Sequence, residues 1–347
     1  MAVLAFHSTA HEAEQVAAQL RAAFSGARTM GCSTMGELGA GRLYRGGISA
    51  MALYEPIRLS AQVVRDTSLF HFSDGETRVE LLARELGLER SGLESAGCVL
   101  VTLTDGLSRS EERLVASLAL ASPGIPLVGG SVADDLKMEG TSVFLDGQVS
   151  PSSSLILLLQ PRVPHRVFAV HHFEATPRRV VVTRAAAAER IVYELDGWPA
   201  AQVYAGLAGI DAADLEADPL LPSRREICFG IRVGPEYRMR SPFSALPGGA
   251  LALRGAVEEG EVLRVMRGQH LVERTRSGLE SATEGLDAQG LLLFNCGGRL
   301  LEAEAHQQLR ELGEAMAPVP SAGFSTYGEQ YGPLLVNHTL TGIAFGG

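Results

Sequence analysis

The sequence predicts a mixed α/β fold of two modules, whose mixed β-sheets combine crossover helices with antiparallel strands. A unit made of an apolar run, an amphipathic helical segment and a second apolar run occurs three times. Each copy ends in a glycine-rich polar loop and is followed by further strand-like segments. The length of 347 residues is about twice that of an average domain. We therefore expect modules of residues 1–165 and 166–347, built from β-α-β-plus-hairpin units that are possible pseudo-symmetric repeats.

The first copy of the unit occupies the N-terminal end of the sequence. It begins with the apolar run Ala2–Phe6 and continues in a segment with apolar residues at helical spacing. Thr9 and Glu12 have capping-box spacing, which predicts the start of that helix. A second short run leads into the loop G-C-S-T-M-G-E at residues 31–37.

The other two copies lie in the middle and near the C-terminal end of the sequence. The middle copy spans Cys98–Asp135, with capping-box spacing from Ser108 and a final loop G-G-S-V-A-D-D. The third begins with Leu291–Phe294, carries one helical stripe over residues 301–316, and ends in G-F-S-T-Y-G-E at residues 323–329. The outer loops share the pattern G-x-S-T-x-G-E, so we interpret the repeat as real.

Strand-like segments follow each unit, and their alternation predicts hairpins. A helix opened by Pro199 is expected in the second module, because proline costs little at the first helical position. The expected hairpin segments are residues 47–54 with 58–64, 141–145 with 155–160, and the stretch 334–345.

Composition excludes several function classes. Thirty basic and forty acidic residues give a net charge of −10, and no basic run occurs. Binding to nucleic acids or to anionic membranes requires clustered Lys and Arg, so neither is expected. Lys137 is the sole lysine, and no phosphate-binding G-x-x-x-x-G-K-[ST] loop is present.

Location and redox state follow from the apolar runs and the cysteines. The longest strongly apolar run, Leu155–Leu159, is far shorter than a membrane span, and the start of the chain lacks a signal-peptide pattern. The four cysteines are far apart and form no C-x-x-C motif, so no disulfide framework or zinc site is expected. We expect a soluble cytoplasmic protein without membrane insertion.

The G-x-S-T-x-G-E loops are candidate ligand-binding loops. Each follows a strand, and open α/β sheets bind ligands at the carboxyl ends of their strands. Their Ser and Thr hydroxyls offer neutral hydrogen-bonding groups, and Glu37 and Glu329 could receive a cationic group. The alternative is structural, because glycine with Ser or Thr also ends a strand and the Glu can cap a neighbouring segment.

Arg299 is a candidate for binding a carboxylate. It follows Asn295 and Cys296 at a predicted strand-to-helix turn, where free N–H groups and the helix dipole favour an anion. The arginine fork matches a carboxylate. The alternative is a solvated arginine on an amphipathic helix.

No catalytic or metal-binding pattern stands out. Cys32 or Cys296 would be a nucleophile only with a histidine nearby, and a buried cysteine in the core is the more common case. His7 and His11 flank a helix start but have no evident third metal ligand. We expect no cofactor, no metal and no enzymatic activity.

The sequence resembles the FIST family, the F-box and intracellular signal transduction proteins. The resemblance covers nearly the whole chain and rests on several motifs in register. These are the two G-x-S-T-x-G-E loops, V-G-G-S-V-A-D-D (128–135), V-F-L-D-G-Q-V (143–149), V-V-T-R-A (181–185), E-L-D-G-W-P-A (194–200) and N-H-T-L-T (337–341). They follow the family's order of an N-terminal and then a C-terminal module.

The resemblance implies a sensory input module that binds small ligands such as amino acids. Bacterial members stand beside or are fused to kinase, chemoreceptor or cyclic-di-nucleotide output domains, and eukaryotic members can be joined to an F-box. No such output motif occurs in this sequence. We therefore expect signalling through a separate output protein.

The resulting hypothesis is a sensor with one cleft between the modules. Glu37 or Glu329 would take the ammonium of an amino acid, and Arg299 would take its carboxylate. The alternatives are a cysteine-dependent enzyme on an amino-acid-like substrate and a docking scaffold without a small ligand. The candidate ligand-binding residues are Cys32, Ser33, Thr34, Glu37, Ser131, Asp134, Cys296, Arg299, Ser325, Thr326, Tyr327, Glu329 and Asn337.

Overall fold

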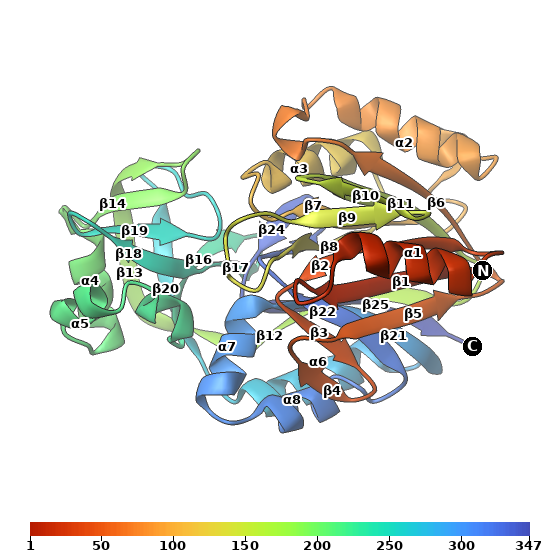
Figure 1. Cartoon of the computed structure of the whole chain (residues 1–347). Helices are drawn as coiled ribbons and strands as arrows, with labels where there is room; N and C mark the ends of the chain where they lie inside the picture. The colour runs from red at the N-terminus through yellow and green to blue at the C-terminus, as the bar shows by residue number, and fades with distance from the viewer.

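The computed structural model describes all 347 residues, which form a main body and a smaller lobe (Figure 1). The main body contains both ends of the chain, residues 1–171 and 271–347, and the lobe is a single excursion over residues 173–268. Sheets with parallel and antiparallel neighbours, covered by helices, confirm the predicted mixed α/β class.

Three copies of one unit build the main body. The first contains β1 (Ala2–Ser8), α1 (Ala13–Ala23), β2 (Arg28–Thr34), β3 (Gly36–Gly39), β4 (Arg42–Tyr44) and β5 (Ile48–Leu53). The second contains β7 (Val99–Asp105), α3 (Glu111–Ala121), β8 (Leu127–Val132), β9 (Ser142–Leu145), β10 (Gln148–Pro151) and β11 (Ser154–Pro161). The third contains β21 (Ala288–Cys296), α7 (Gly297–Ala305), α8 (Leu309–Ala315), β22 (Ser321–Thr326), β23 (Glu329–Tyr331), β24 (Leu334–Val336) and β25 (Thr339–Gly346).

The three units contribute to their sheets in the same strand order. The first strand of each unit pairs in parallel with the second strand and antiparallel with the last strand of its own unit. The short hairpins are exchanged in a cycle: β3 pairs with β22, β23 pairs with β8, and β9 pairs with β2. Each unit therefore completes the sheet of another, which ties the first and last thirds of the main body together.

The first glycine of each repeated loop is explained by a close approach between neighbouring strands. A Cβ at Gly31 would lie 1.7 Å from the carbonyl oxygen of Ala5. The corresponding distances are 2.0 Å for Gly129 and 1.9 Å for Gly323, again to a carbonyl oxygen of the adjacent first strand. Only glycine fits at these three positions.

The inner faces of the three sheets share one apolar core. Phe324 stacks on Phe6 with ring centroids 4.9 Å apart and meets Phe294 edge-on at 5.7 Å, which joins strands of the first and third units. The helices lie on the outside of the sheets (Figure 1). The core thus holds the carboxyl ends of the second strands, where the repeated loops begin, in fixed positions.

Two strand–helix pairs precede the second and third units. They are β6 (Ile57–Val64) with α2 (Asp74–Glu85), and β12 (His165–His171) with α6 (Leu271–Thr283). β6 pairs antiparallel with β11, and β12 pairs antiparallel with β25. The predicted hairpins of 47–54 with 58–64 and of 141–145 with 155–160 are therefore wrong, because β5 pairs with β1 while β9 pairs with β10 and β2.

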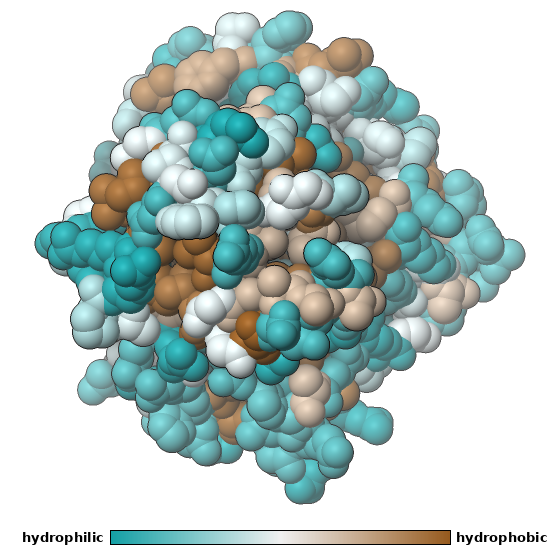
Figure 2. All heavy atoms as spheres, turned by 90° about the vertical axis from the view of Figure 1, so that its left-hand side faces the viewer, coloured by the Kyte–Doolittle hydropathy of each residue, from teal (hydrophilic) through white to brown (hydrophobic).

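The lobe is an antiparallel sheet with two short helices. Its elements are β13 (Phe173–Ala186), β14 (Ile191–Leu195), β15 (Trp198–Pro199), α4 (Ala200–Ala208), α5 (Ala212–Ala217), β16 (Ile227–Val233), β17 (Glu236–Arg240), β18 (Pro242–Leu246), β19 (Ala250–Leu253) and β20 (Val262–Gly268). Three 3₁₀ turns, Thr67–Leu69, Arg90–Gly92 and Leu221–Arg224, complete the chain. Seen from the lobe side, the surface is largely hydrophilic with apolar residues gathered near its middle (Figure 2).

Several local expectations differ from the structure. Strands from both sides of residue 165 pair with each other, because β3 pairs with β22 and β8 pairs with β23. Both predicted capping boxes are wrong. The N-cap residue of α1 is Glu12 and not Thr9, whose hydroxyl donates to Asp135 at 3.2 Å. Glu111 is the first residue of α3, so Ser108 is not the N-cap residue of that helix. The single helical stripe over 301–316 is two helices, α7 and α8.

The α-helices of this protein contain 6 to 13 residues each. None of them combines the length and the apolar composition that crossing a bilayer would require.

Candidate functional site

The two G-x-S-T-x-G-E loops have the same hydrogen bonds. Thr34 donates its hydroxyl to Glu37 at 2.5 Å, and the other carboxylate oxygen of Glu37 accepts the N–H of Gly47 at 2.8 Å. In the third unit, Thr326 donates to Glu329 at 2.5 Å, and the N–H of Thr339 donates to the same carboxyl group. Each Glu therefore fixes the loop to the start of the last strand of its own unit.

Burial sets the protonation of Glu329. It raises the pKa of this carboxyl group to about 8, although the bonds from Thr326 and Thr339 act in the opposite direction. Burial likewise raises the pKa of Glu37. Both side chains are fully buried, so neither offers an exposed carboxylate to an ammonium group.

This pKa predicts that the contribution of Glu329 to stability falls with increasing pH. The unfolded Glu329 ionises near 4.5 and the folded one near 8, so unfolding releases a proton between these values. Burial also lowers the pKa values of His338, His7, His171 and His172, which makes stability rise with pH over the range in which the unfolded histidines lose their protons. Comparison with Glu329→Gln cancels this histidine contribution. Between pH 5.5 and 7 we expect the free energy of unfolding of the parent protein, minus that of Glu329→Gln, to fall by about 1.4 kcal/mol per pH unit.

Urea unfolding at a series of pH values measures this slope. The control Glu314→Gln, at an exposed position on α8, should show the same pH-dependent difference from Glu329→Gln as the parent protein does. A difference in stability that stays constant over this pH range would contradict the raised pKa of Glu329.

Arg299 has partners on all three of its nitrogens. Nε donates to Asn295 at 2.9 Å, and the terminal nitrogens lie 2.6 Å from the Thr275 hydroxyl and 3.2 Å from His172 Nδ1. The other ring nitrogen of His172 lies 2.9 Å from Glu302. Arg299 is fully buried, and this network joins α7 to α6 and to the strand that leads into the lobe.

The remaining candidate residues are also held by the fold. Cys32 is a core residue, the Ser33 hydroxyl accepts the N–H of Ser142, and Ser325 bonds to Asn295. The hydroxyl of Ser131 lies 3.1 Å from that of Thr104.

Asp134 and Asn337 hold segments that lie beside a pocket. Burial disfavours the Asp134 carboxylate, but the Tyr327 hydroxyl and three backbone N–H groups outweigh this and lower its pKa. Asn337 accepts the N–H of Ser241 at 3.1 Å, which links the third unit to the lobe.

A pocket lies between the main body and the lobe. Cys296, Thr326 and Tyr327, three of the predicted residues, line it from the main body. Its cavity volume is about 30 Å³, enough for one or two water molecules. The lobe contributes Ser223, Ser241, Phe243 and Arg254. The structure thus brings part of the predicted set together, but adds residues that sequence analysis missed.

Arg254 is the most informative of the missed residues. Its guanidinium lies 3.5 Å from the centroid of the Phe243 ring and 4.7 Å from that of Tyr327. Its one hydrogen-bond contact is the sulfur of Met138 at 4.0 Å, and it belongs to no ion pair. Burial lowers its pKa to about 10, so it remains a cation at neutral pH. The pocket therefore contains a positive charge without an anionic partner.

The N-terminus of α7 faces the same pocket. Gly297 and Gly298 line it, and the positive end of the helix dipole points there. A Cβ at Gly298 would lie 2.6 Å from the His338 ring, so glycine is required for the chain to pass this ring. Arg254 and the helix end both favour an anion.

Cys296 is protonated at this helix end. Burial raises the pKa of its thiol, and the nearby Glu329 raises it further. The ring of His338 bonds through Nε2 to Ser241 at 2.8 Å, while its buried Nδ1 has no partner. A cysteine nucleophile requires a lowered thiol pKa, so this environment argues against the enzyme alternative.

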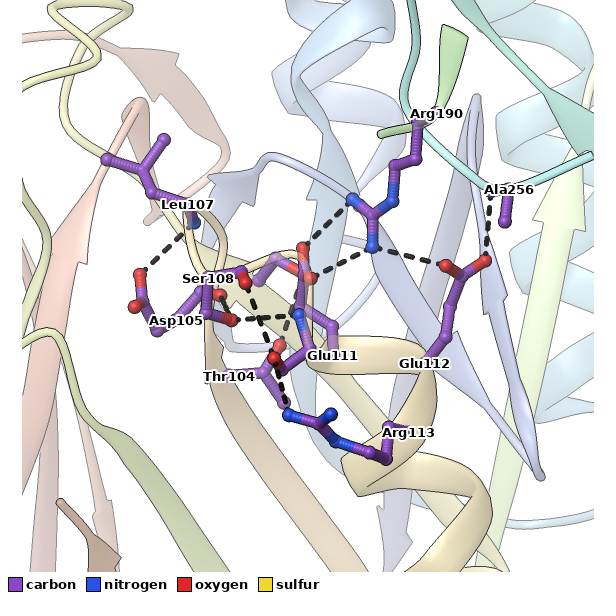
Figure 3. Close-up of polar contacts among 12 residues, drawn as sticks. Thr104, Asp105, Leu107, Ser108, Glu111, Glu112, Arg113, Arg190 and Ala256 are labelled. Atoms are coloured by element: carbon purple, nitrogen blue, oxygen red, sulfur yellow. Dashed lines mark hydrogen bonds and ion pairs between the residues drawn. The ribbon is translucent and has the colours of Figure 1, made fainter. Parts of the chain in front are cut away.

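An ion-pair cluster fastens the lobe to the main body (Figure 3). Arg190, at the turn between β13 and β14, donates to Glu111 at 2.9 Å and to Glu112 at 3.2 Å. Glu112 also accepts the N–H of Ala256 from the lobe at 3.2 Å. Arg190 and Glu111 are buried, with side chains 9% and 2% exposed. We call these four residues the latch.

No group of three or more His, Cys, Asp or Glu side chains is arranged to hold a metal ion.

Two family models match the sequence. The FIST N domain matches residues 1–198, and the FIST C domain matches residues 200–332. Comparison with curated proteins gives no match. The two matched ranges meet inside the lobe, directly before α4, and both contribute residues to the pocket and to the latch.

Proposed function

The chain belongs to the FIST family, whose domains are associated with signal-transduction sensing, and on this basis we propose that it senses a small carboxylate. The ligand class is an amino acid or a related metabolite, and the site is the pocket between the lobe and the main body. The observation that carries the proposal is Arg254, an unpaired guanidinium beside the N-terminus of α7.

The chemistry of the pocket suits a carboxylate. An arginine fork can donate two parallel hydrogen bonds to it, and a helix N-terminus adds a favourable dipole. Phe243 and Tyr327 limit the positions of the guanidinium, so less freedom is lost on binding. In this proposal Arg254 takes the place that the sequence assigned to Arg299, whose nitrogens are occupied.

The size of the pocket suggests how binding produces a signal. A cavity of about 30 Å³ is too small for an amino acid, so the ligand must move the lobe outward as it binds. The latch opposes this movement, which sets the energy that binding must supply. A separate output protein would then recognise the displaced lobe through the apolar residues on its face (Figure 2).

Thermal unfolding against a panel of compounds tests the proposal. The panel contains the twenty amino acids, their decarboxylated amines and simple mono- and dicarboxylates. A carboxylate at one hundred times its dissociation constant should stabilise the protein by about 2.7 kcal/mol, and the matching amine should not.

Arg254→Gln should abolish the shift, while Arg232→Gln, at an exposed position on β16, should retain it. A shift that survives Arg254→Gln would place the ligand elsewhere, and no shift with any carboxylate would reject the proposed ligand class.

A further inference from the structure

The outer edge of β5 is unlike the corresponding edges in the other two sheets. In all three, the last strand of a unit pairs with the first strand of that unit. Outside this last strand, β11 carries β6 and β25 carries β12, both antiparallel. β5 ends its five-stranded sheet, and no strand pairs with its outer side.

The backbone of β5 offers free hydrogen-bonding groups on that side. Ser8 donates its N–H to Gly47, which starts the alternating ladder between β1 and β5. Counting along this ladder, Ser49, Met51 and Leu53 bond to β1, whereas Ala50 and Ala52 direct their N–H and C=O groups outward. Both alanines are exposed and have no partner for these groups.

A groove of about 430 Å³ runs beside this edge. Ala50 to Leu53 form one wall, and Pro320, Ala322 and Phe345 from the third unit form part of the rest. β12 occupies the corresponding place beside β25, where it lies close to β8. The groove is therefore where a further antiparallel strand would lie.

We propose that the edge of β5 binds an extended segment of a partner protein by adding it as an antiparallel strand. β6 indicates the sequence pattern required, because its alternate residues Ile57, Leu59, Ala61 and Val63 face the central core. Residues of β22 and β25 lie beside β5, at the place where a second copy of this chain would have to put its own sheet. A single extended segment therefore suits the groove better than a second copy.

A fluorescent peptide with the sequence of β6, I-R-L-S-A-Q-V-V, is the first probe. We expect saturable binding to the full chain and slower hydrogen exchange at Ala50 and Ala52. Two further peptides carry N-methyl groups on alternate residues, one on the odd and one on the even positions. The peptide whose methylated nitrogens face β5 should bind at least about tenfold more weakly than the parent peptide. The other methylated peptide should bind as well as the parent.

Variants of Ala52 provide the matched test on the protein. Proline removes an N–H that faces outward, and edge strands tolerate this change. Ala52→Pro should therefore fold but lose the peptide, while Ala52→Val keeps the N–H and should retain it.

Three results would overturn the proposal. One is the absence of peptide binding. Another is binding that ignores both N-methylation and Ala52→Pro, because that would show non-specific apolar contact. The third is a dimer that Ala52→Pro dissociates, since the edge would then bind a second copy of this chain. The lobe pocket and this groove share no lining residue, so carboxylate binding serves as a separate readout.

Discussion

Replacing Arg299 with methionine is expected to destabilise the protein by about 3–5 kcal/mol. The change removes a fully buried cation and leaves His172, Asn295 and Thr275 without their partner. Chemical denaturation measures the loss. Arg276→Met, at an exposed position on α6, is the control and should change stability by less than about 0.5 kcal/mol.

This experiment also separates two assignments of Arg299. If it supports the fold, Arg299→Met lowers stability with or without a carboxylate present. An Arg299→Met protein that is as stable as the parent but no longer responds to the carboxylate would restore the ligand-binding assignment made from the sequence.

Breaking the latch is expected to have the second large effect. Arg190→Ala leaves Glu111 buried without its cation, which should cost about 3–5 kcal/mol. Arg184→Ala is the control, because its ion pair with Glu194 is largely exposed and should contribute less than about 1 kcal/mol. Denaturant unfolding of the two variants gives both values.

The latch variant should also change ligand binding. Since the latch holds the lobe against the main body, Arg190→Ala should increase the affinity for the carboxylate. Unchanged or weaker affinity in a folded Arg190→Ala protein would show that lobe movement does not limit binding.

The fold was largely predictable because its signal is local and repeated. Three similar runs of strand, helix and strand indicated the units, and their loop glycines mark close contacts between adjacent strands. The exchange of hairpins was not predictable, because β3, β9 and β23 are short strands whose partners lie in other units. Hydrophobic alternation indicates a strand but not which edge it joins.

The candidate site was only partly predictable, because local sequence does not show which side chains pack together in the fold. The polar loops were found from their pattern, and some of their residues line the pocket. The local sequences around Arg299 and Arg254 do not distinguish the two arginines. Their roles differ because different groups pack around each side chain in the fold. Arg299 has hydrogen-bond partners from three segments of the chain, whereas the guanidinium of Arg254 contacts two aromatic rings and a methionine.

A carboxylate that moves the lobe on binding should change the distance between the lobe and the main body. All four native cysteines are buried, so spin labels can be attached selectively at Glu216→Cys in the lobe and Glu80→Cys on α2. The distance between these labels, measured by pulsed electron spin resonance, should shift when the stabilising carboxylate is added. It should not shift in Arg254→Gln. An unchanged distance in the presence of bound carboxylate would contradict the account.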